Sequence, residues 1–392
     1  MVSKKAKAID SSTTHPTVSA AVLIEDLIGD AFAQEKFGEH PTPVMIWGQP
    51  GVGKSQIART VGRKTGRPVV DIRLLLKDPT DLSGLPYYSP TDDKMHYAHP
   101  SDLPEVNGPL SNAILLLDEL PAAPQAVQSS ALQLVLEREI GTYKLPDGVM
   151  ILAAGNRATD GASYNNMPTA LRNRFRHYTM VVDTKSWLDW ARESGIDVSI
   201  QALIRSNPEL LNTFDPSERH VFAFATPRSW EFVSNEIKKV KQLRDVGIEV
   251  SDTSLFRRVA SIVGEDIRIK FKAFYEDAEC LPDPHAVVSG KIKTFNIDKT
   301  PMKYACSINL MYALRDTIRR EERENEEFSK DQYNTYVDNA IRFLVDNIDE
   351  KDMVLSALWM ANDPEYKIKL SGASALMELV DDPEYDSFFA AM

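Results

Sequence analysis

The sequence predicts an α/β fold whose core is a five-stranded parallel sheet with helices on both faces, followed by an α-helical region. Five short runs that are apolar or β-rich carry the strand prediction, and helical patterns such as 56–64 and 126–139 separate most of them. Continuous apolar runs that alternate with helices are typical of parallel strands covered on both faces. The predicted strands are residues 44–47, 69–74, 114–117, 150–154 and 178–182.

Helices are predicted on either side of this sheet region. Over residues 18–37 apolar side chains recur at helical spacing and lead into the first strand. After residue 183 such patterns dominate, and proline and glycine residues interrupt them over 280–301, which favours an irregular connection there. The helical candidates of this half are 186–194, 197–205, 228–244, 254–276, 304–327, 330–348, 352–361 and 371–380.

These patterns divide the chain into four predicted segments. The polar, lysine-containing beginning of the chain lacks hydrophobic periodicity, which predicts a disordered tail. The sheet with its helices forms the second segment, and the helices beyond the last strand form the third and fourth. The predicted boundaries are 1–18 for the tail, 19–185 for the α/β core, 186–283 for a helical lid and 284–392 for a helical C-terminal extension.

The composition limits the classes of protein to which the chain can belong. With 45 Lys and Arg against 57 Asp and Glu, the net charge is −12, which argues against a broad basic face for nucleic acid. The two cysteines, Cys280 and Cys306, are too few for a disulfide framework, so we expect a cytoplasmic protein. The chain lacks an apolar run near the roughly 20 residues that span a bilayer, so no membrane association is expected. Protein partners are therefore favoured.

The strongest functional signal is the segment GQPGVGKS at residues 48–55, which fits the phosphate-binding pattern G-x-x-x-x-G-K-[ST]. It directly follows a predicted strand and precedes a predicted helix, as this loop requires. The glycines allow backbone N–H groups to converge on phosphate oxygens at a helix N-terminus, where the dipole favours an anion. We expect Lys54 to reach the β and γ phosphates of ATP and Ser55 to hold Mg²⁺. The predicted nucleotide-binding residues of the loop are Gly48, Pro50, Gly51, Val52, Gly53, Lys54, Ser55 and Gln56.

Two further strands end in polar side chains that fit the same chemistry. Asp118 follows the apolar run ILLL, where a carboxylate is costly to bury unless it meets a cation, so we expect it to bind Mg²⁺. The next residue, Glu119, is then placed to polarise the water that attacks the γ phosphate. Asn156 ends the following strand and can hydrogen-bond that water or the γ phosphate without adding negative charge. Alone, each pattern is also typical of an ordinary strand end or turn.

These three motifs, in this order on a five-stranded core with a helical region behind it, resemble those of an AAA+ ATPase. Within that family, the stretch from Gly108 through LLLDELPAAPQAVQSSALQLVLER to Lys144 resembles the MoxR group. The resemblance covers roughly residues 20–245, and residues 285–392 resemble no family that we recognise. It implies an ATPase with ATP and Mg²⁺ as its ligands.

The resemblance also implies two kinds of arginine contact with the nucleotide. Arg172 and Arg174 occupy the segment that carries an arginine finger in such proteins, which reaches the γ phosphate in the neighbouring subunit. The sequence does not choose between these two arginines. Arg228 in Thr-Pro-Arg matches the sensor-2 position, from which an arginine reaches the nucleotide in the same subunit. Without the resemblance, the proline there predicts only a helix N-terminus.

Members of the MoxR group carry two insertions that face the central pore of a ring, and this chain has a candidate for each. Residues 78–90 fit the first insertion and residues 141–148 the second. For the tyrosines of these segments, local packing is an equally good interpretation. The resemblance makes Tyr87, Tyr88, Tyr143 and Lys144 candidate contacts with a substrate chain.

The resemblance implies ATP hydrolysis at subunit interfaces of a ring, expected to be a hexamer, that remodels, assembles or activates a protein partner. A protein with a von Willebrand factor A domain is a common partner of such ATPases. One alternative is a nucleic-acid motor, but the first insertion region holds Asp78, Asp81, Asp92 and Asp93 against Lys77 and Lys94. The other alternative is a nucleotide-gated scaffold with negligible turnover, against which the presence of Glu119 and Asn156 argues.

Overall fold

The computed structural model describes residues 15–161, 164–218, 220–325, 327–362, 368–370, 372–380, 383–385 and 389. The chain divides into two compact units, Met1–Trp190 with Leu211–Glu231 and Ala191–Leu210 with Phe232–Met392. We call the first the α/β unit and the second the helical unit. The segment boundaries expected at residues 185 and 283 stay a prediction.

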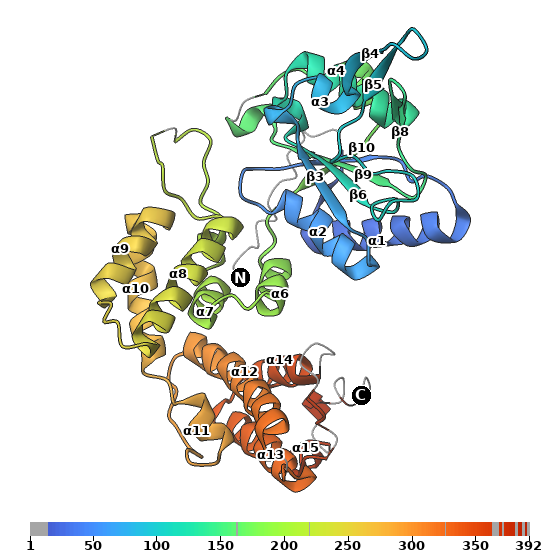
Figure 1. Cartoon of the computed structure of the whole chain (residues 1–392). Coiled ribbons are helices and arrows are strands. Elements are labelled where there is room, and N and C mark those ends of the chain that lie inside the picture. Colours follow the sequence, from blue (N-terminus) through green and yellow to red (C-terminus); the bar gives the residue numbers. More distant parts are fainter. Residues whose placement is uncertain are drawn as a thin grey trace. The chain divides into compact units, whose positions relative to one another are not determined.

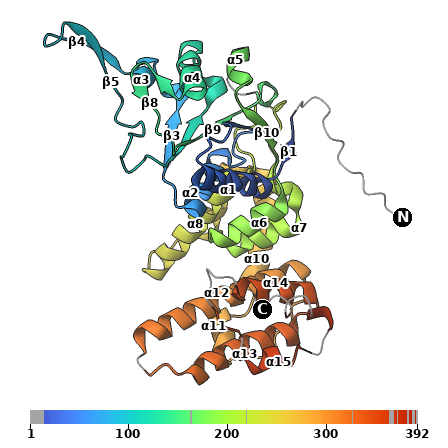
Figure 2. The same ribbon diagram turned by 90° about the vertical axis from the view of Figure 1, so that its right-hand side faces the viewer.

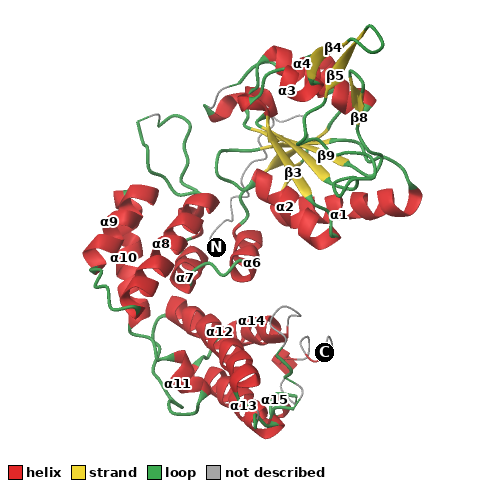
Figure 3. Cartoon of the chain, viewed as in Figure 1, coloured by secondary structure: helices red, strands yellow, loops and turns green. Residues whose placement is uncertain are grey.

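The α/β unit is built on a parallel six-stranded sheet in the order β1-β10-β2-β9-β6-β3. Figure 1 labels β3, β6, β9 and β10 of this sheet, and Figure 3 draws its strands in yellow. Five of its strands confirm the predicted sheet. The sixth, β1 (Thr17–Val18), pairs with β10 at the sheet edge, so the prediction of a disordered tail was wrong for these residues. Two residues are too few to show a periodic pattern, and residues 1–14 lie outside the described part of the chain. The other strands are β2 (Val44–Trp47), β3 (Val69–Arg73), β6 (Ile114–Asp118), β9 (Met150–Gly155) and β10 (Arg176–Met180).

Helices cover both faces of this sheet, because alternate side chains of each strand point to opposite faces. In β6, Ile114 belongs to the apolar cluster of α1 (Ala20–Phe37) and α2 (Lys54–Thr65). Its neighbour Leu115 belongs to the cluster of α4 (Gln125–Glu137) on the other face. Figure 2 shows α1 and α2 on one side of the sheet and α4 on the other. Burial on both faces accounts for the continuous apolar runs from which the strands were predicted.

Two antiparallel hairpins lie in the segments that overlap the predicted insertions. The first joins β4 (Leu85–Ser89) to β5 (Lys94–Ala98) and projects from the sheet (Figure 2). The second joins β7 (Glu139–Ile140) to β8 (Tyr143–Lys144) and follows α4 directly. The short helices of this unit are α3 (Thr80–Ser83) and α5 (Thr169–Arg172), and α6 (Thr184–Glu193) begins after β10.

The helical unit consists of helices and connecting loops over its described residues (Figure 3). The single helix expected over 254–276 is wrong: Gly264, at φ 93° and ψ 161°, separates α9 (Asp252–Val263) from α10 (Glu265–Glu279). The connection expected over 280–301 contains a short helix, α11 (Pro284–Val288). Of the predicted helix over 371–380, the structure describes residues 372–380, and among these only Ser374–Met377 (α15) is helical. The remaining helices are α7 (Val198–Ser206), α8 (Pro227–Asp245), α12 (Thr300–Glu324), α13 (Lys330–Asn347) and α14 (Lys351–Asn362).

Candidate functional site

The loop between β2 and α2 has a backbone conformation that only glycine adopts without strain. Gly51 and Gly53 have φ angles of 75° and 97°, in the left-handed region. A Cβ atom on Gly51 would lie 2.6 Å from the Thr226 side-chain oxygen, so this position also lacks room for a side chain. α2 begins at Lys54, and its N-cap residue Gly53 provides no side chain to cap the first-turn amides. These amides can therefore bind an anion.

Lys54 lies at the centre of the site, with its side chain buried. Its ammonium group donates to the backbone oxygens of Gly48 (2.9 Å) and Gln49 (3.0 Å) and to Asn156 Oδ1 (2.7 Å). Burial lowers the pKa of Lys54 to about 8, although the charges of Glu119 and Asp118 raise it in part. A buried ammonium that donates to uncharged oxygens is suited to receive an anionic ligand, so this environment fits a triphosphate.

Ser55 and Asp118 meet at the carboxyl end of β6. Ser55 Oγ donates to Asp118 Oδ2 at 2.9 Å, and Asp118 Oδ1 accepts from the backbone N–H of Glu119 at 3.0 Å. A hydroxyl oxygen and a carboxylate oxygen in contact are a donor set that suits Mg²⁺, which binds one or two protein oxygens and completes its shell with phosphates and water. Over the described residues, clusters of three or more His, Cys, Asp or Glu side chains that could hold a metal ion are absent. The residues present therefore fit Mg²⁺ that arrives with a nucleotide.

Glu119 and Asn156 lie at the ends of neighbouring strands and are brought together with Lys54. Asn156 Nδ2 lies 3.5 Å from Glu119 Oε2, while its Oδ1 accepts from Lys54. Burial raises the pKa of Glu119, and the charge of Lys54 lowers it again in part. Glu119 has φ 55° and ψ 33°, an uncommon conformation for a residue with a side chain. The amide thus bridges the phosphate-binding lysine and the carboxylate predicted to act on water.

Two residues that shape this site, Thr226 and Gly155, were not predicted from the sequence. Thr226 fills the space beside Gly51, and the next residue but one, Arg228, donates its backbone N–H to the Gly51 oxygen at 3.1 Å. Gly155 packs so closely against Pro121 that a Cβ atom would lie 2.2 Å from the proline Cδ. The sequence shows a glycine directly before Asn156. It does not show that Pro121, which is distant in sequence, leaves no room for a side chain there.

The three predicted arginines are placed differently. The start of α8 contacts the phosphate loop through Arg228, and the charge of Arg228 acts on the pKa of both Lys54 and Glu119. Arg172 and Arg174 are exposed and do not belong to the hydrogen-bonded group around Lys54. The Arg172 guanidinium donates instead to Thr169 within its own short helix, at 3.2 Å.

The candidate pore contacts also separate into two classes. Tyr87 and Tyr88, on the β4–β5 hairpin, are 51% and 57% exposed, and Lys144 is exposed on β8. Tyr143 is buried, and its hydroxyl donates to the Pro104 oxygen. Burial raises the pKa of the Tyr143 hydroxyl. Tyr143 is therefore a core residue, and its interpretation as a candidate pore contact is corrected.

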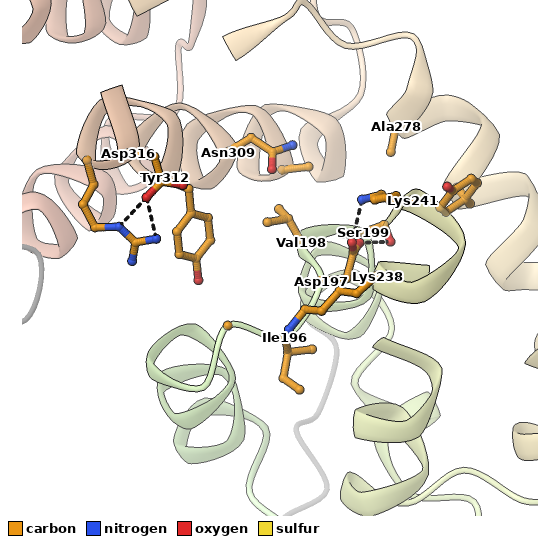
Figure 4. A pocket seen from close by; sticks show the side chains of 14 residues that line it. Ile196, Asp197, Val198, Ser199, Lys238, Lys241, Ala278, Asn309, Tyr312 and Asp316 are labelled. Atoms are coloured by element: carbon orange, nitrogen blue, oxygen red, sulfur yellow. Dashed lines mark hydrogen bonds and ion pairs between the residues drawn. The ribbon is translucent and has the colours of Figure 1, made fainter. Parts of the chain in front are cut away.

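A cavity of about 420 Å³ lies within the helical unit, between the start of α7 and helices α8, α10 and α12 (Figure 4). Its wall carries two ion pairs, Asp197 with Lys241 at 2.7 Å and Asp316 with Arg315 at 2.9 Å. The predicted nucleotide-binding residues do not line this cavity. It is thus separate from the site around Lys54.

Among the helices of the described residues, none combines the length and the apolar character that crossing a bilayer requires.

Comparisons with known proteins agree with the geometry. Residues 43–177 match the model of the ATPase family associated with various cellular activities (AAA). Midasin of Giardia intestinalis is 28% identical over 166 residues, which are 38% of this chain and 3% of midasin. Chaperone MoxR1 of Mycobacterium tuberculosis is 29% identical over 137 residues, 34% of each protein. The chain thus spans only a small part of midasin and about a third of MoxR1.

Among the solved structures similar to this chain is a RuvB variant of Thermotoga maritima, with a TM-score of 0.38 and 14% sequence identity. The match covers 71% of this chain and 78% of the RuvB chain. The matched segment 43–177 contains the phosphate loop, the Asp118–Glu119 pair and Asn156. The family model and the similarity to MoxR1 agree with the predicted resemblance: residues 43–177 form a domain of the AAA ATPase family, and the chain is similar to ATPases of the MoxR type.

Proposed function

We propose that this ATPase hydrolyses ATP at interfaces between its own copies in a ring, expected to be a hexamer, and so remodels, assembles or activates a protein partner. The observation that carries the proposal is the convergence of Lys54, Asn156 and Glu119 beside the Ser55–Asp118 pair. The similarity to chaperone MoxR1 supports the chaperone-like part of the proposal.

Each residue of the site has a part in the proposed reaction. The first-turn amides of α2 and the Lys54 ammonium bind phosphate oxygens of ATP. Asn156 orients the attacking water, and Glu119 accepts a proton from that water at its carboxylate. Ser55 and Asp118 would hold Mg²⁺, which when bound neutralises charge on the β and γ phosphates.

The proposed ring completes the site with an arginine from the neighbouring copy. Arg172 and Arg174 are exposed in their own chain, which leaves either of them available to an adjacent nucleotide. An arginine supplied in trans is worth about 10³ to 10⁵ in rate. Arg228 would report on the nucleotide within the same subunit, since its backbone already contacts the phosphate loop.

The partner is proposed to be a protein, for example one with a von Willebrand factor A domain. The exposed tyrosines Tyr87 and Tyr88 and the exposed Lys144 are the proposed contacts with it. On the β4–β5 hairpin, Asp92 and Asp93 lie beside these tyrosines, and this acidic character does not favour nucleic acid. We propose a cytoplasmic location, which the two free cysteines, Cys280 and Cys306, support.

Steady-state phosphate release tests the function when the wild type is compared with one variant that should not bind ATP and with one that should bind ATP but hydrolyse it slowly. Lys54→Ala should lose nucleotide binding, because the buried cation that meets the phosphates is removed. Glu119→Gln should bind ATP but release phosphate roughly 10²- to 10⁴-fold more slowly, the usual contribution of a general base. Held in the ATP state, it should also remain assembled and retain its protein partner in a pull-down.

Lys64→Ala at the exposed end of α2 and Glu25→Gln on the exposed face of α1 are matched controls. Both should hydrolyse ATP like the wild type. If Glu119→Gln released phosphate as fast as the wild type, the role assigned to this carboxylate would be wrong. A wild-type protein that stays monomeric at every nucleotide concentration would contradict the ring.

A further inference from the structure

A hydrogen-bonded bridge connects the phosphate-loop strand to the segment that carries the two candidate arginines. Trp47, the last residue of β2, donates from its indole Nε1 to His177 Nδ1 on β10 at 2.9 Å. The other ring nitrogen, His177 Nε2, lies 2.7 Å from the backbone oxygen of Arg172 at the end of α5. The Trp47 and His177 rings lie edge to edge and nearly coplanar, with their centroids 6.0 Å apart and an interplanar angle of 17°.

The chemistry of the partners fixes the form of the imidazole. An indole nitrogen can only donate, so His177 Nδ1 must be the unprotonated acceptor. A carbonyl oxygen can only accept, so Nε2 must carry the proton that is donated to Arg172. The bridge therefore needs a neutral imidazole with its proton on Nε2. The side chain at this position must accept a hydrogen bond from Trp47 on one side of its ring and donate one to the Arg172 oxygen on the other.

Both ends of the bridge lie next to functional groups. Trp47 directly precedes Gly48, whose oxygen accepts from the Lys54 ammonium at 2.9 Å. Arg172 is one of the two candidate finger residues, and Arg174 follows two positions later. The contacts thus run without interruption from Lys54 through Gly48, Trp47 and His177 to the arginine segment.

The hydrogen bonds of Lys54 explain how nucleotide binding can affect this connection. An ammonium group has three protons to donate, and those of Lys54 are all used, on the oxygens of Gly48, Gln49 and Asn156. A phosphate can gain a hydrogen bond from Lys54 only if at least one of these three acceptors shares or loses its own. Binding therefore changes contacts at the origin of the bridge, which is the differential interaction that a switch requires.

We propose that His177 is a positioning residue that couples the phosphate loop of one subunit to the arginine segment which the same subunit presents to its neighbour. This inference rests on the proposed function, because the arginine acts only across a subunit interface. His177 does not touch the nucleotide in this scheme. It holds the end of α5 in a position that depends on whether the phosphate loop has bound nucleotide. Neighbouring sites around the ring therefore do not hydrolyse ATP independently of one another.

Three variants separate the two halves of the bridge. His177→Asn has an amide near the position of Nδ1 and can accept from Trp47 but falls short of the Arg172 oxygen. His177→Gln extends further and can donate toward Arg172 but loses the acceptor that faces Trp47. Trp47→Phe keeps an aromatic ring and removes the donor. His40→Gln, at an exposed histidine before β2, is the matched control.

For these variants we expect ATP affinity, measured in the Glu119→Gln background, to stay within about threefold of the wild type, while turnover falls and the Hill coefficient for ATP drops toward one. A coupling of the usual size predicts a loss of turnover of roughly five- to 150-fold. The loss should not add to that of the finger variant, because His177→Gln has nothing left to position once the arginine is gone. The control should match the wild type in all three readouts.

Arg172→Ala and Arg174→Ala, measured in parallel, keep the two hypotheses apart. If neither arginine variant loses turnover, the proposed arginine finger is wrong, whatever the His177 variants show. The proposed coupling through His177 is then wrong as well, because it depends on that arginine. If one arginine variant loses turnover while every His177 and Trp47 variant keeps wild-type turnover and cooperativity, the coupling alone is overturned. A melting temperature and ATP affinity that fall in step with turnover would mean a merely structural role, and would also overturn it.

Discussion

A buried lysine in each unit shows how differently the two parts of the chain treat a charge. Lys303, in α12 of the helical unit, is 9% exposed and pairs with the carboxylates of Asp349 and Glu350, which raise its pKa. Lys54, in the α/β unit, is 7% exposed, but its hydrogen bonds go to uncharged oxygens, and burial lowers its pKa to about 8. The helical unit places carboxylates in direct contact with its lysine, whereas in the α/β unit the Lys54 ammonium contacts uncharged oxygens, and the charges of Glu119 and Asp118 only partly offset its burial.

The largest expected effect comes from giving Lys54 the kind of partner that Lys303 has. Asn156→Asp places a carboxylate where the amide oxygen now accepts from Lys54 at 2.7 Å. The new charge should pair with the ammonium and repel the phosphates, and like charges in contact cost several kcal/mol. ATP affinity, measured with a fluorescent analogue, should fall by roughly 100-fold or more.

Asn156→Ser, which is uncharged, is the control for that substitution and should lose much less affinity. If Asn156→Asp bound ATP as tightly as Asn156→Ser, the uncharged character of this position would not matter to nucleotide binding. The comparison between the two lysines would then lose its functional meaning.

A second, smaller effect tests the close approach of the phosphate loop to Thr226. Gly51→Ala combines a strained φ of 75° with a Cβ atom only 2.6 Å from the Thr226 oxygen, so it should lower the free energy of unfolding by about 1–3 kcal/mol. Gly29→Ala, in the middle of α1, has no heavy atom within 4 Å of the new Cβ and should instead stabilise by roughly 0.5–1 kcal/mol. Denaturant unfolding measures both. Equal effects of the two substitutions would contradict the crowding at Gly51.

The sequence predicted the parts of the site in which chemistry restricts the residue type. Glycines with positive φ, a lysine and a hydroxyl at fixed spacing define the phosphate loop, and carboxylates after a buried strand define its partner. Burial of Tyr143 could not be predicted in this way, because it depends on the oxygen of Pro104, which is 39 positions away. The role of Thr226 was missed for the same reason, since its contact with Gly51 joins distant parts of the chain.

In the helical unit most of the longer helices were predicted, and the functional meaning was not. Apolar residues at helical spacing suffice to place α12 and α13, because many side chains satisfy a packed helix face. The break at Gly264 was not expected, since a glycine within a periodic pattern is compatible with a continuous helix. Packing alone carries no information about a partner, so nothing in this half indicated a reaction.

The third prediction concerns pH and again separates the lysines. Phosphate binding needs a protonated Lys54, whose pKa of about 8 without nucleotide should rise when an anion meets the ammonium. ATP affinity should therefore be nearly constant below pH 8 and weaken above it by up to about tenfold per pH unit. Lys54→Arg stays protonated throughout, so its affinity, whatever its absolute value, should be flat between pH 7 and 9.5. A flat wild-type profile would contradict the lowered pKa.

The smallest expected effect is the loss of Lys303. Lys303→Met removes an ammonium whose partner Asp349 is largely exposed, so the pair is screened and should contribute about 1 kcal/mol or less. Because the pKa of Lys303 is raised in the folded state, its contribution is complete below the ordinary value near 10.5 and is lost only above it. The difference in unfolding free energy between Lys303→Met and the wild type should then be constant from pH 6 to 9, with ATP affinity unchanged, and Lys291→Met is the exposed control. If that difference changed between pH 6 and 9, the pKa of Lys303 would not be raised in the folded state, and the contrast with Lys54 would fail.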